Sequence, residues 1–117
     1  MTLNLKEFKR FEKQIILKKI GISGQKKIKG AKVLIIGMGG LGCPLLIYLA
    51  SSGVNNIGIV DHDKIELGNL NRQILFNTSD LGKYKVNQAK IKIKKIYNEI
   101  KIKTIKIKIT RKNIKTI

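Results

Sequence analysis

An apolar run that stops at a cluster of glycines limits what this chain can fold into more than any other feature. The run Val33–Ile36 is rich in β-branched residues, and Gly37, Gly39 and Gly42 follow it before a segment with helical character. At this spacing the first glycine permits a tight turn, the second lets backbone N–H groups approach an anion, and the third lets the helix pack closely on the strand. The helix N-terminus would then face a nucleotide phosphate. The turn alone leaves open whether it binds a phosphate or is a plain structural corner.

The segments on either side of the glycines predict a β–α–β unit. Val33–Ile36 has no polar face, so we expect a strand buried on both sides, as in a parallel sheet covered by helices. Apolar residues at helical spacing follow the glycines, and Gly53 is placed to end that helix. Ile57–Val60 predicts the second buried strand, which ends at Asp61.

Other patterns extend this unit at both ends. The further elements that we predict are a helix from Leu5 through at least Ile16 that stops at Gly21, a helix capped by Ser23 that runs to Ile28, a short helix over Asn69–Leu75, a helix over 84–99 and a strand over 102–109. The fold class is therefore α/β, with a Rossmann-like parallel sheet preceded by N-terminal helices. We expect one domain, with a helical lead-in over 1–30, a core over 31–110 and a basic tail without further elements over 111–117.

Length and cysteine content exclude several classes of protein. The 117 residues allow one domain at most, and two or three strands are few for a doubly wound sheet, so we expect a truncated domain or a protomer that needs a partner. No run of 18 or more apolar residues is present, which argues against a membrane span. Cys43 is the single cysteine, so the chain by itself forms no disulfide or zinc site. A cytoplasmic location fits best, or an organelle stroma or matrix if the gene lies in an organelle.

The net charge of +18, from 25 Lys and Arg against 7 Asp and Glu, has two explanations. A strongly basic chain suggests a polyanionic partner such as nucleic acid. Heavy use of Lys, Ile and Asn is also what an AT-rich genome produces by compositional drift. Aromatic residues make up only 5% of the chain, so base-stacking platforms are scarce and drift is favoured over nucleic-acid binding.

Asp61 adds a second nucleotide-binding feature. It follows the predicted second strand about twenty residues after the glycine turn, where an acidic residue can accept hydrogen bonds from a ribose. The glycines and Asp61 together leave NAD, FAD and ATP open as the ligand.

Four motifs together resemble the ThiF/MoeB/HesA family, the bacterial relatives of ubiquitin-activating enzymes. They are Gly37-Met-Gly-Gly-Leu-Gly42, Asp61-His-Asp63, Asn69-Leu-Asn-Arg72-Gln73-Ile-Leu-Phe76 and Gly82-Lys-Tyr-Lys85. The resemblance implies an adenylyltransferase that uses ATP and Mg²⁺ to activate the C-terminal carboxylate of a ubiquitin-like sulfur-carrier protein, in thiamine or molybdopterin synthesis. It also implies a homodimer, or association with a missing C-terminal half. Among the possible functions, it makes a nicotinamide-binding protein the least favoured.

The resemblance also implies which residues hold ATP. Gly40 resembles the glycine that contacts ATP in the turn, and Asp61 the acid that binds ribose. Asn69, Arg72 and Lys85 match triphosphate-contacting residues, and the two cations would stabilise the charge that builds up in carboxylate attack on phosphorus. The expected nucleotide-binding residues are Gly37, Gly39, Gly40, Gly42, Asp61, Asp63, Asn69, Arg72, Gln73 and Lys85, with Arg72 and Lys85 also expected as catalytic. Of these, Gln73 is expected to shape the loop rather than to touch substrate.

The sequence departs from the family pattern at several points. The family's N-terminal motif carries two arginines, and the second reaches the ATP of the partner subunit. This chain keeps Arg10 but has Lys13 at the second place, so that contact loses its fork-shaped donor. The family's magnesium-binding aspartate would lie beyond Ile117, and the paired CxxC motifs are also missing, so we expect no metal site within this chain. Cys43 is expected to pack beside the turn rather than to act as a catalytic thiol.

Two functions from different classes remain at this point. The first is the N-terminal, ATP-binding part of a ThiF/MoeB-type adenylyltransferase, which we expect to be inactive alone. The second is a non-catalytic module on a decayed nucleotide-binding fold, whose basic surface would bind an acidic protein or RNA.

Overall fold

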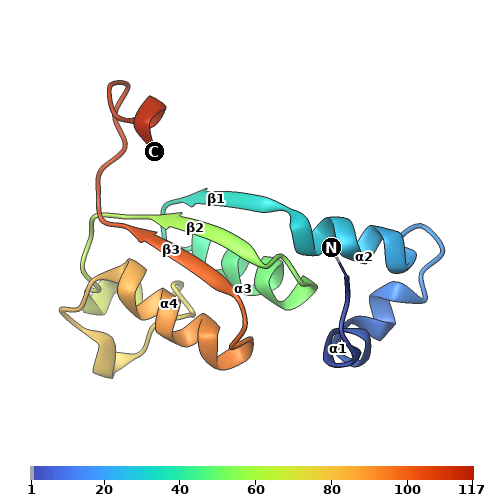
Figure 1. Cartoon of the computed structure of the whole chain (residues 1–117). Coiled ribbons are helices and arrows are strands. Elements are labelled where there is room, and N and C mark those ends of the chain that lie inside the picture. Colours follow the sequence, from blue (N-terminus) through green and yellow to red (C-terminus); the bar gives the residue numbers. More distant parts are fainter. Residues whose placement is uncertain (1) are drawn as a thin grey trace.

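The computed structural model describes residues 2–117 and has the predicted α/β architecture (Figure 1). In chain order its helices and strands are α1 (Leu5–Ile15), α2 (Gly21–Gly30), β1 (Lys32–Ile36), α3 (Gly42–Ser52), β2 (Asn56–Val60), α4 (Lys85–Ile96) and β3 (Lys101–Ile105). Single turns of 3₁₀ helix lie at Leu67–Asn69, Thr78–Asp80 and Ile114–Thr116. Within residues 2–117 no helix has both the length and the apolar character that a membrane crossing requires.

The three strands form one parallel sheet in the order β1–β2–β3. Their register is regular, because Asn56 at the start of β2 pairs with both Lys32 and Lys101. The carboxyl ends of the strands therefore meet at one edge, where the glycine turn follows β1 and Asp61 follows β2. The Rossmann-like β–α–β unit with a third strand is confirmed.

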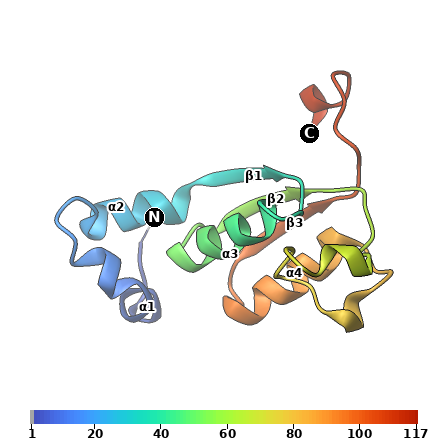
Figure 2. The same cartoon turned by 180° about the vertical axis from the view of Figure 1, so that it is seen from behind.

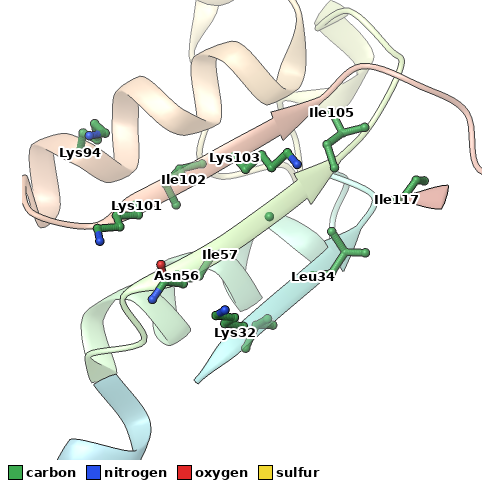
Figure 3. A pocket seen from close by; sticks show the side chains of 12 residues that line it. Lys32, Leu34, Asn56, Ile57, Lys94, Lys101, Ile102, Lys103, Ile105 and Ile117 are labelled. Atoms are coloured by element: carbon green, nitrogen blue, oxygen red, sulfur yellow. The ribbon is translucent and has the colours of Figure 1, made fainter. Parts of the chain in front are cut away.

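Helices α3 and α4 lie on the same side of the sheet, as both views in Figures 1 and 2 show. The core lies between them and the sheet. It is built from buried side chains, among them Ile35, Ile57, Ile59 and Ile102 of the strands and Leu46, Ala50, Ala89 and Ile93 of the helices. No α-helix of residues 2–117 covers the opposite side, where Ile117 near the chain end lines part of the surface (Figure 3), so most of that face of the sheet is open.

The prediction that Val33–Ile36 is buried on both sides is therefore wrong. Leu34 is 45% exposed and Ile36 is 54% exposed, whereas Ile35 between them is 4% exposed. Alternate residues of a strand point to opposite faces of its sheet, so Leu34 and Ile36 share the open face.

Helices α1 and α2 pack beside the amino ends of the strands (Figure 1). Asn4 caps α1, since its side chain accepts a hydrogen bond from the Glu7 N–H and the Glu7 carboxylate accepts one from the Asn4 N–H. The predicted first helix is thus confirmed, although it ends at Ile15. The predicted Ser23 cap is wrong, because α2 already begins at Gly21, whose φ of +59° suits glycine.

Polar contacts fasten these two helices to the core. Glu7 forms an ion pair with Lys29 of α2 at 2.9 Å. The side-chain amides of Gln14 and Gln25 both donate to the Ser52 carbonyl at the end of α3, at 2.9 and 3.0 Å. The lead-in therefore belongs to the same packed unit as the sheet.

Three predicted elements after β2 differ from those observed. The helix expected over Asn69–Leu75 is a single 3₁₀ turn at Leu67–Asn69, in which the Asn69 side chain accepts a hydrogen bond from the Glu66 N–H. Helix α4 ends at Ile96 rather than at residue 99, because Tyr97 leaves the helical conformation and packs edge-on against Phe11, with ring centroids 6.1 Å apart.

Strand β3 ends at Ile105 rather than at residue 109. Its partner β2 ends at Val60, which pairs with Ile105, so the residues after Ile105 have no strand to pair with. The chain then leaves the sheet, and the tail that was expected to hold no element carries the 3₁₀ turn at Ile114–Thr116.

Candidate functional site

The glycine turn joins β1 to α3, and two of its positions require glycine. Gly37 has a φ of +99°, which glycine adopts without strain, and its N–H donates to the Val60 carbonyl at 2.7 Å. A Cβ on Gly42 would overlap the Gly37 carbonyl group, so the first turn of α3 lies directly against the end of β1. Both positions thus have the geometric requirements expected from the sequence.

Asp61 ties the end of β2 to this turn. Its carboxylate accepts a hydrogen bond from the Met38 N–H at 2.8 Å through Oδ2, and one from the Asp63 N–H at 2.8 Å through Oδ1. The carboxylate is therefore held in one orientation beside the glycines. Each oxygen retains lone-pair capacity for a further donor, such as a ribose hydroxyl.

Four consecutive backbone N–H groups at the turn remain free. Those of Gly39, Gly40, Leu41 and Gly42 donate to no acceptor within residues 2–117, and the first helical bond of α3 runs from the Cys43 N–H to the Gly39 carbonyl at 3.0 Å. Free N–H groups at a helix start, with the positive end of the helix dipole, favour an anion. Leu41 was not singled out in the sequence, since a backbone donor leaves no mark on residue type.

Arg72 reaches the same turn from the loop after β2. A Cβ on Gly40 would lie 3.4 Å from Arg72 Cγ, so the aliphatic part of the arginine covers the glycine. The guanidinium is exposed, and its Nη1 donates to the Gly68 carbonyl at 3.2 Å and to Asn71 Oδ1 at 2.9 Å. A cationic fork thus stands beside the free N–H groups.

Gln73 lies beneath the turn and is 3% exposed. Its Nε2 would lie 3.8 Å from a Cβ on Gly39, and its Oε1 is buried without a hydrogen-bond partner in residues 2–117. A buried amide oxygen without a hydrogen-bond partner destabilises the folded state by about 1–3 kcal/mol. Stability therefore does not explain why a glutamine occupies this position.

Lys85, the first residue of α4, is 6% exposed. Its N–H donates to the Asp63 carbonyl at 3.1 Å, while its ammonium makes no hydrogen bond or ion pair within residues 2–117. Burial raises the pKa of the neighbouring Cys43 thiol to about 11, against a smaller opposing effect from the Lys85 charge. The lysine therefore lies near the start of α3, and the fully buried Cys43 is a packing residue.

The side chains of Asn69 and Asp63 have a less direct link to the glycine turn than those of Asp61 and Arg72. The Asn69 side-chain oxygen is engaged by the Glu66 N–H at 2.9 Å, which leaves its amide N–H₂ as the group that could meet a ligand. Asp63 is exposed and its carboxylate lies 3.1 Å from His62 Nε2. Of these two residues only Asp63 lines the hollow of about 180 Å³ at the carboxyl edge of the sheet, together with Gly37 and Asp61.

Lys108 also lines this hollow, from the segment after β3. The sequence contained no signal for it, because it is one lysine among many in a basic tail. Its position depends on the early end of β3, which turns the chain across the edge of the sheet.

Asp61, His62 and Asp63 offer possible ligand atoms within 4.8 Å of one another. The Asp61 oxygens already accept backbone N–H groups, and Asp63 and His62 are exposed, so these residues give no built metal site. The N-terminal Arg10 is engaged elsewhere: it donates to the Ile96 carbonyl and stacks on Tyr97 at 4.8 Å from the ring centroid.

Comparisons with known proteins identify the family of the chain. Residues 11–117 match the profile of the ThiF family. The adenylyltransferase and sulfurtransferase MOCS3 of Culex quinquefasciatus is 45% identical over 115 residues, which cover 98% of this chain and 26% of that protein. The probable molybdopterin-synthase adenylyltransferase of Gracilaria tenuistipitata var. liui is 46% identical over 101 residues, which cover 86% of this chain and 28% of that protein.

The chain is also similar to proteins of known structure. E. coli MccB, in a crystal structure with ATP, has a TM-score of 0.77 and 38% identity, covering 80% of this chain and 28% of MccB. TcdA (CsdL) has a TM-score of 0.91 over 99% of this chain and 46% of that chain, and at 23% identity it supports the fold alone. The chain spans about a quarter of the length of the curated relatives that it matches.

Proposed function

The chain belongs to the ThiF family, and from that premise we propose that it provides the ATP-binding part of an adenylyltransferase site. The substrate to be activated is the C-terminal carboxylate of a ubiquitin-like sulfur-carrier protein. The whole reaction needs structure that this chain, at about a quarter of its relatives' length, does not contain.

One observation carries the proposal: four free backbone N–H groups and the Arg72 guanidinium meet at the turn that Asp61 holds. These donors fit a phosphate chain, and the Asp61 carboxylate fits the ribose at its end. The buried, unpaired oxygen of Gln73 and the unpaired ammonium of Lys85 lie in the same region, where a polar ligand would give them partners.

The chemistry assigns a role to each group. A carboxylate oxygen of the carrier attacks the α-phosphorus of ATP, a new O–P bond forms, the bond to the bridging oxygen breaks, and pyrophosphate leaves. Arg72 can bind two phosphate oxygens at once, whereas Lys85 supplies a point charge. The turn N–H groups stabilise the added negative charge without reorganising. Magnesium, when bound with ATP, would neutralise phosphate charge, and we place its protein ligand outside this chain.

Relatives support the class of reaction. MOCS3 and UBA4 are adenylyltransferases and sulfurtransferases by name, and MccB has been crystallised with ATP and, separately, with an ATP analogue and MccA. Because these relatives are three to four times longer, we propose that this chain binds ATP but does not adenylate a carrier unaided.

Titration calorimetry of the 117-residue chain with ATP tests the binding step. We expect saturable ATP binding that Arg72→Ala weakens about tenfold or more, since a charge-assisted fork is lost. Arg111→Ala is the matched control, because it removes the same charge from the tail, and it should leave binding unchanged. Equal losses in the two variants would contradict a specific site.

Binding experiments on the same chain also distinguish the ATP-binding function from the rival function, a non-catalytic basic module. A basic module for RNA or an acidic protein predicts RNA binding with a steep salt dependence and no loss on Arg72→Ala. Pyrophosphate exchange by the chain with ATP and a carrier protein alone would overturn the proposal that it is inactive unaided.

A further inference from the structure

Asp80 is a buried carboxylate outside the glycine turn. It is 2% exposed and lies in the 3₁₀ turn Thr78–Asp80. The segment that carries Arg72 and Gln73 precedes this turn, and α4, which begins with Lys85, follows it. In both views of the fold this connection lies at the amino end of α4 (Figures 1 and 2). The carboxylate therefore stands between the two parts of the chain that bring cationic side chains to the nucleotide site.

Both oxygens of the Asp80 carboxylate are engaged. Oδ2 accepts a hydrogen bond from the Asn77 N–H at 2.8 Å and forms an ion pair with the Lys92 ammonium at 3.0 Å. Oδ1 accepts a hydrogen bond from the Gln88 side-chain amide at 2.9 Å. Asn77 belongs to the loop, whereas Gln88 and Lys92 lie one turn apart on α4. One side chain thus fastens the loop to the helix.

The face of α4 that Asp80 holds is the face on which Lys85 lies. Lys85, Gln88 and Lys92 are separated by three and four residues, which places them along one side of the helix. Helical side chains lean toward the N-terminus of their helix, so the Lys85 side chain extends past the start of α4. Burial raises the pKa of the Cys43 thiol, in the first turn of α3, to about 11, and the opposing effect of the Lys85 charge places the ammonium near that turn.

Backbone hydrogen bonds continue the connection to the edge of the sheet. The Lys83 N–H donates to the Asp80 carbonyl at 3.1 Å, and the Lys83 carbonyl accepts from the Ile65 N–H at 2.9 Å. The Lys85 N–H donates to the Asp63 carbonyl at 3.1 Å. The turn that Asp80 closes is therefore joined to the segment that follows β2.

The charge of Asp80 is matched by Lys92, which leaves Lys85 available. Within residues 2–117 Lys85 forms no ion pair, although a buried carboxylate lies on the same side of its helix. Because Asp80 is engaged by the loop and by the later turns of α4, the Lys85 ammonium keeps its donors for an anion such as a phosphate.

We propose that Asp80 is a positioning residue for the nucleotide site: by holding the loop against α4, it directs the Lys85 ammonium toward the phosphates of ATP. The assignment rests on the proposed ATP-binding function, and Asp80 itself touches no nucleotide. Its negative charge alone would repel ATP. Positioning and simple electrostatics therefore predict opposite effects when the charge is removed.

Titration calorimetry of the 117-residue chain with ATP and, separately, with adenosine tests the proposal. Asp80→Asn keeps the size of the side chain and removes the ion pair. We expect about tenfold weaker ATP binding and adenosine binding within about twofold of the unaltered chain, since only the phosphates meet Lys85. Tighter ATP binding would mean that Asp80 acts through its charge alone. An equal loss for both ligands would mean that it only holds the fold, and either result overturns the proposal.

A double-mutant cycle with Lys85→Met tests whether Asp80 acts through the lysine. Lys85→Met alone should weaken ATP binding about tenfold, and the addition of Asp80→Asn should weaken it less than about twofold further. Losses that multiply would contradict the proposal. Glu99→Gln is the matched control, because it removes one negative charge from an exposed residue after α4, and it should leave both affinities unchanged.

Two further variants define what the carboxylate needs. Gln88→Met removes one neutral hydrogen bond but leaves the Lys92 ion pair and the Asn77 cap, so its ATP affinity should stay within about twofold. Asp80→Asn with Lys92→Met leaves no buried charge unpaired and keeps the net charge at +18, so it provides a variant that folds if Asp80→Asn alone does not. The same tenfold loss of ATP affinity is expected for this pair, and unaltered affinity would overturn the proposal.

Hydrogen exchange without nucleotide separates this inference from the proposed function. In Asp80→Asn the N–H groups of Gly82, Lys83 and Lys85 should exchange about tenfold faster, while those of β2 should keep their rates. If the unaltered chain binds no ATP, the proposed function fails whatever the exchange rates are. If it binds ATP and the Lys85 N–H exchanges at an unchanged rate in Asp80→Asn, the positioning role fails while the proposed function stands.

Discussion

Gly42 lies so close to Gly37 that a Cβ on Gly42 would overlap the Gly37 carbonyl oxygen and carbon. This contact sets the distance between β1 and the first turn of α3. The free N–H groups of the turn are consequently held at the carboxyl edge of the sheet, beside Asp61.

We therefore expect Gly42→Ala to lower the free energy of unfolding by about 2–3 kcal/mol or more, because backbone must move to admit the methyl group. Urea denaturation followed by circular dichroism measures the change. Gly68→Ala is the control: nothing lies within 4 Å of a Cβ there and no positive φ is required, so its stability should stay within about 0.5 kcal/mol. A similar loss in both variants would mean that the close approach is not what Gly42 provides.

Gln73→Met should separate stability from binding. Because the Gln73 Oε1 is buried without a partner, an apolar side chain of similar shape should leave the unfolding free energy unchanged or raise it by about 1 kcal/mol. ATP affinity should fall if that oxygen serves the nucleotide site.

Gln88→Met is the contrasting variant, since the Gln88 amide donates to Asp80 Oδ1 at 2.9 Å. It should lose about 1 kcal/mol of stability without a direct effect on ATP binding. If Gln73→Met destabilises as much as Gln88→Met, the unpaired oxygen has a structural partner in solution.

Two buried carboxylates should make stability depend on acid. Burial acts to raise the pKa of Glu7, but the Asn4 N–H and the Lys29 ammonium outweigh it and lower that pKa below 4.5. In the same way burial acts to raise the pKa of Asp80, and the Asn77 N–H, the Gln88 amide and Lys92 lower it below 3.8. A lowered folded-state pKa stabilises the fold above the unfolded-state pKa, and this contribution is lost as the pH falls through the folded-state pKa.

Glu7→Gln should thus lower the free energy of unfolding by about 1–2 kcal/mol at pH 7. The difference in this free energy between the variant and the unaltered chain should disappear below about pH 4.5. Urea midpoints between pH 7 and pH 3 measure it. Glu12→Gln is the control, because Glu12 is exposed and 4.0 Å from Lys13, and its gap should stay near zero throughout. A gap for Glu7→Gln that does not change with pH would show that the Lys29 pair does not depend on ionised Glu7.

Cys43 should be unreactive in the native chain. It is fully buried, and the rise of its pKa from 9.0 to about 11 lowers the thiolate fraction at pH 8 about a hundredfold. Ellman's reagent should label it slowly in buffer and rapidly in urea. Equal rates in the two solvents would show that the start of α3 opens readily.

Local features of the sequence were sufficient for much of this structure. The spacing of Gly37 and Gly42 predicted a strand–turn–helix unit because a positive φ and a missing Cβ are needed at those positions, whatever lies elsewhere. Gly53, with a φ of +108°, ended α3 for the same reason. Asp61 and Arg72, which were singled out in two separate motifs, both lie at the glycine turn.

Contacts between distant segments decided the rest. Whether Leu34 and Ile36 are buried depends on which side of the sheet α3 and α4 occupy, and an apolar run cannot encode that choice. The end of β3 is set by the length of β2, and the end of α4 by the packing of Tyr97 on Phe11. The sequence by itself determined where the chain turns, because the turn depends on local backbone chemistry. Only the tertiary structure decided that one face of the sheet is open, because burial depends on how distant elements pack.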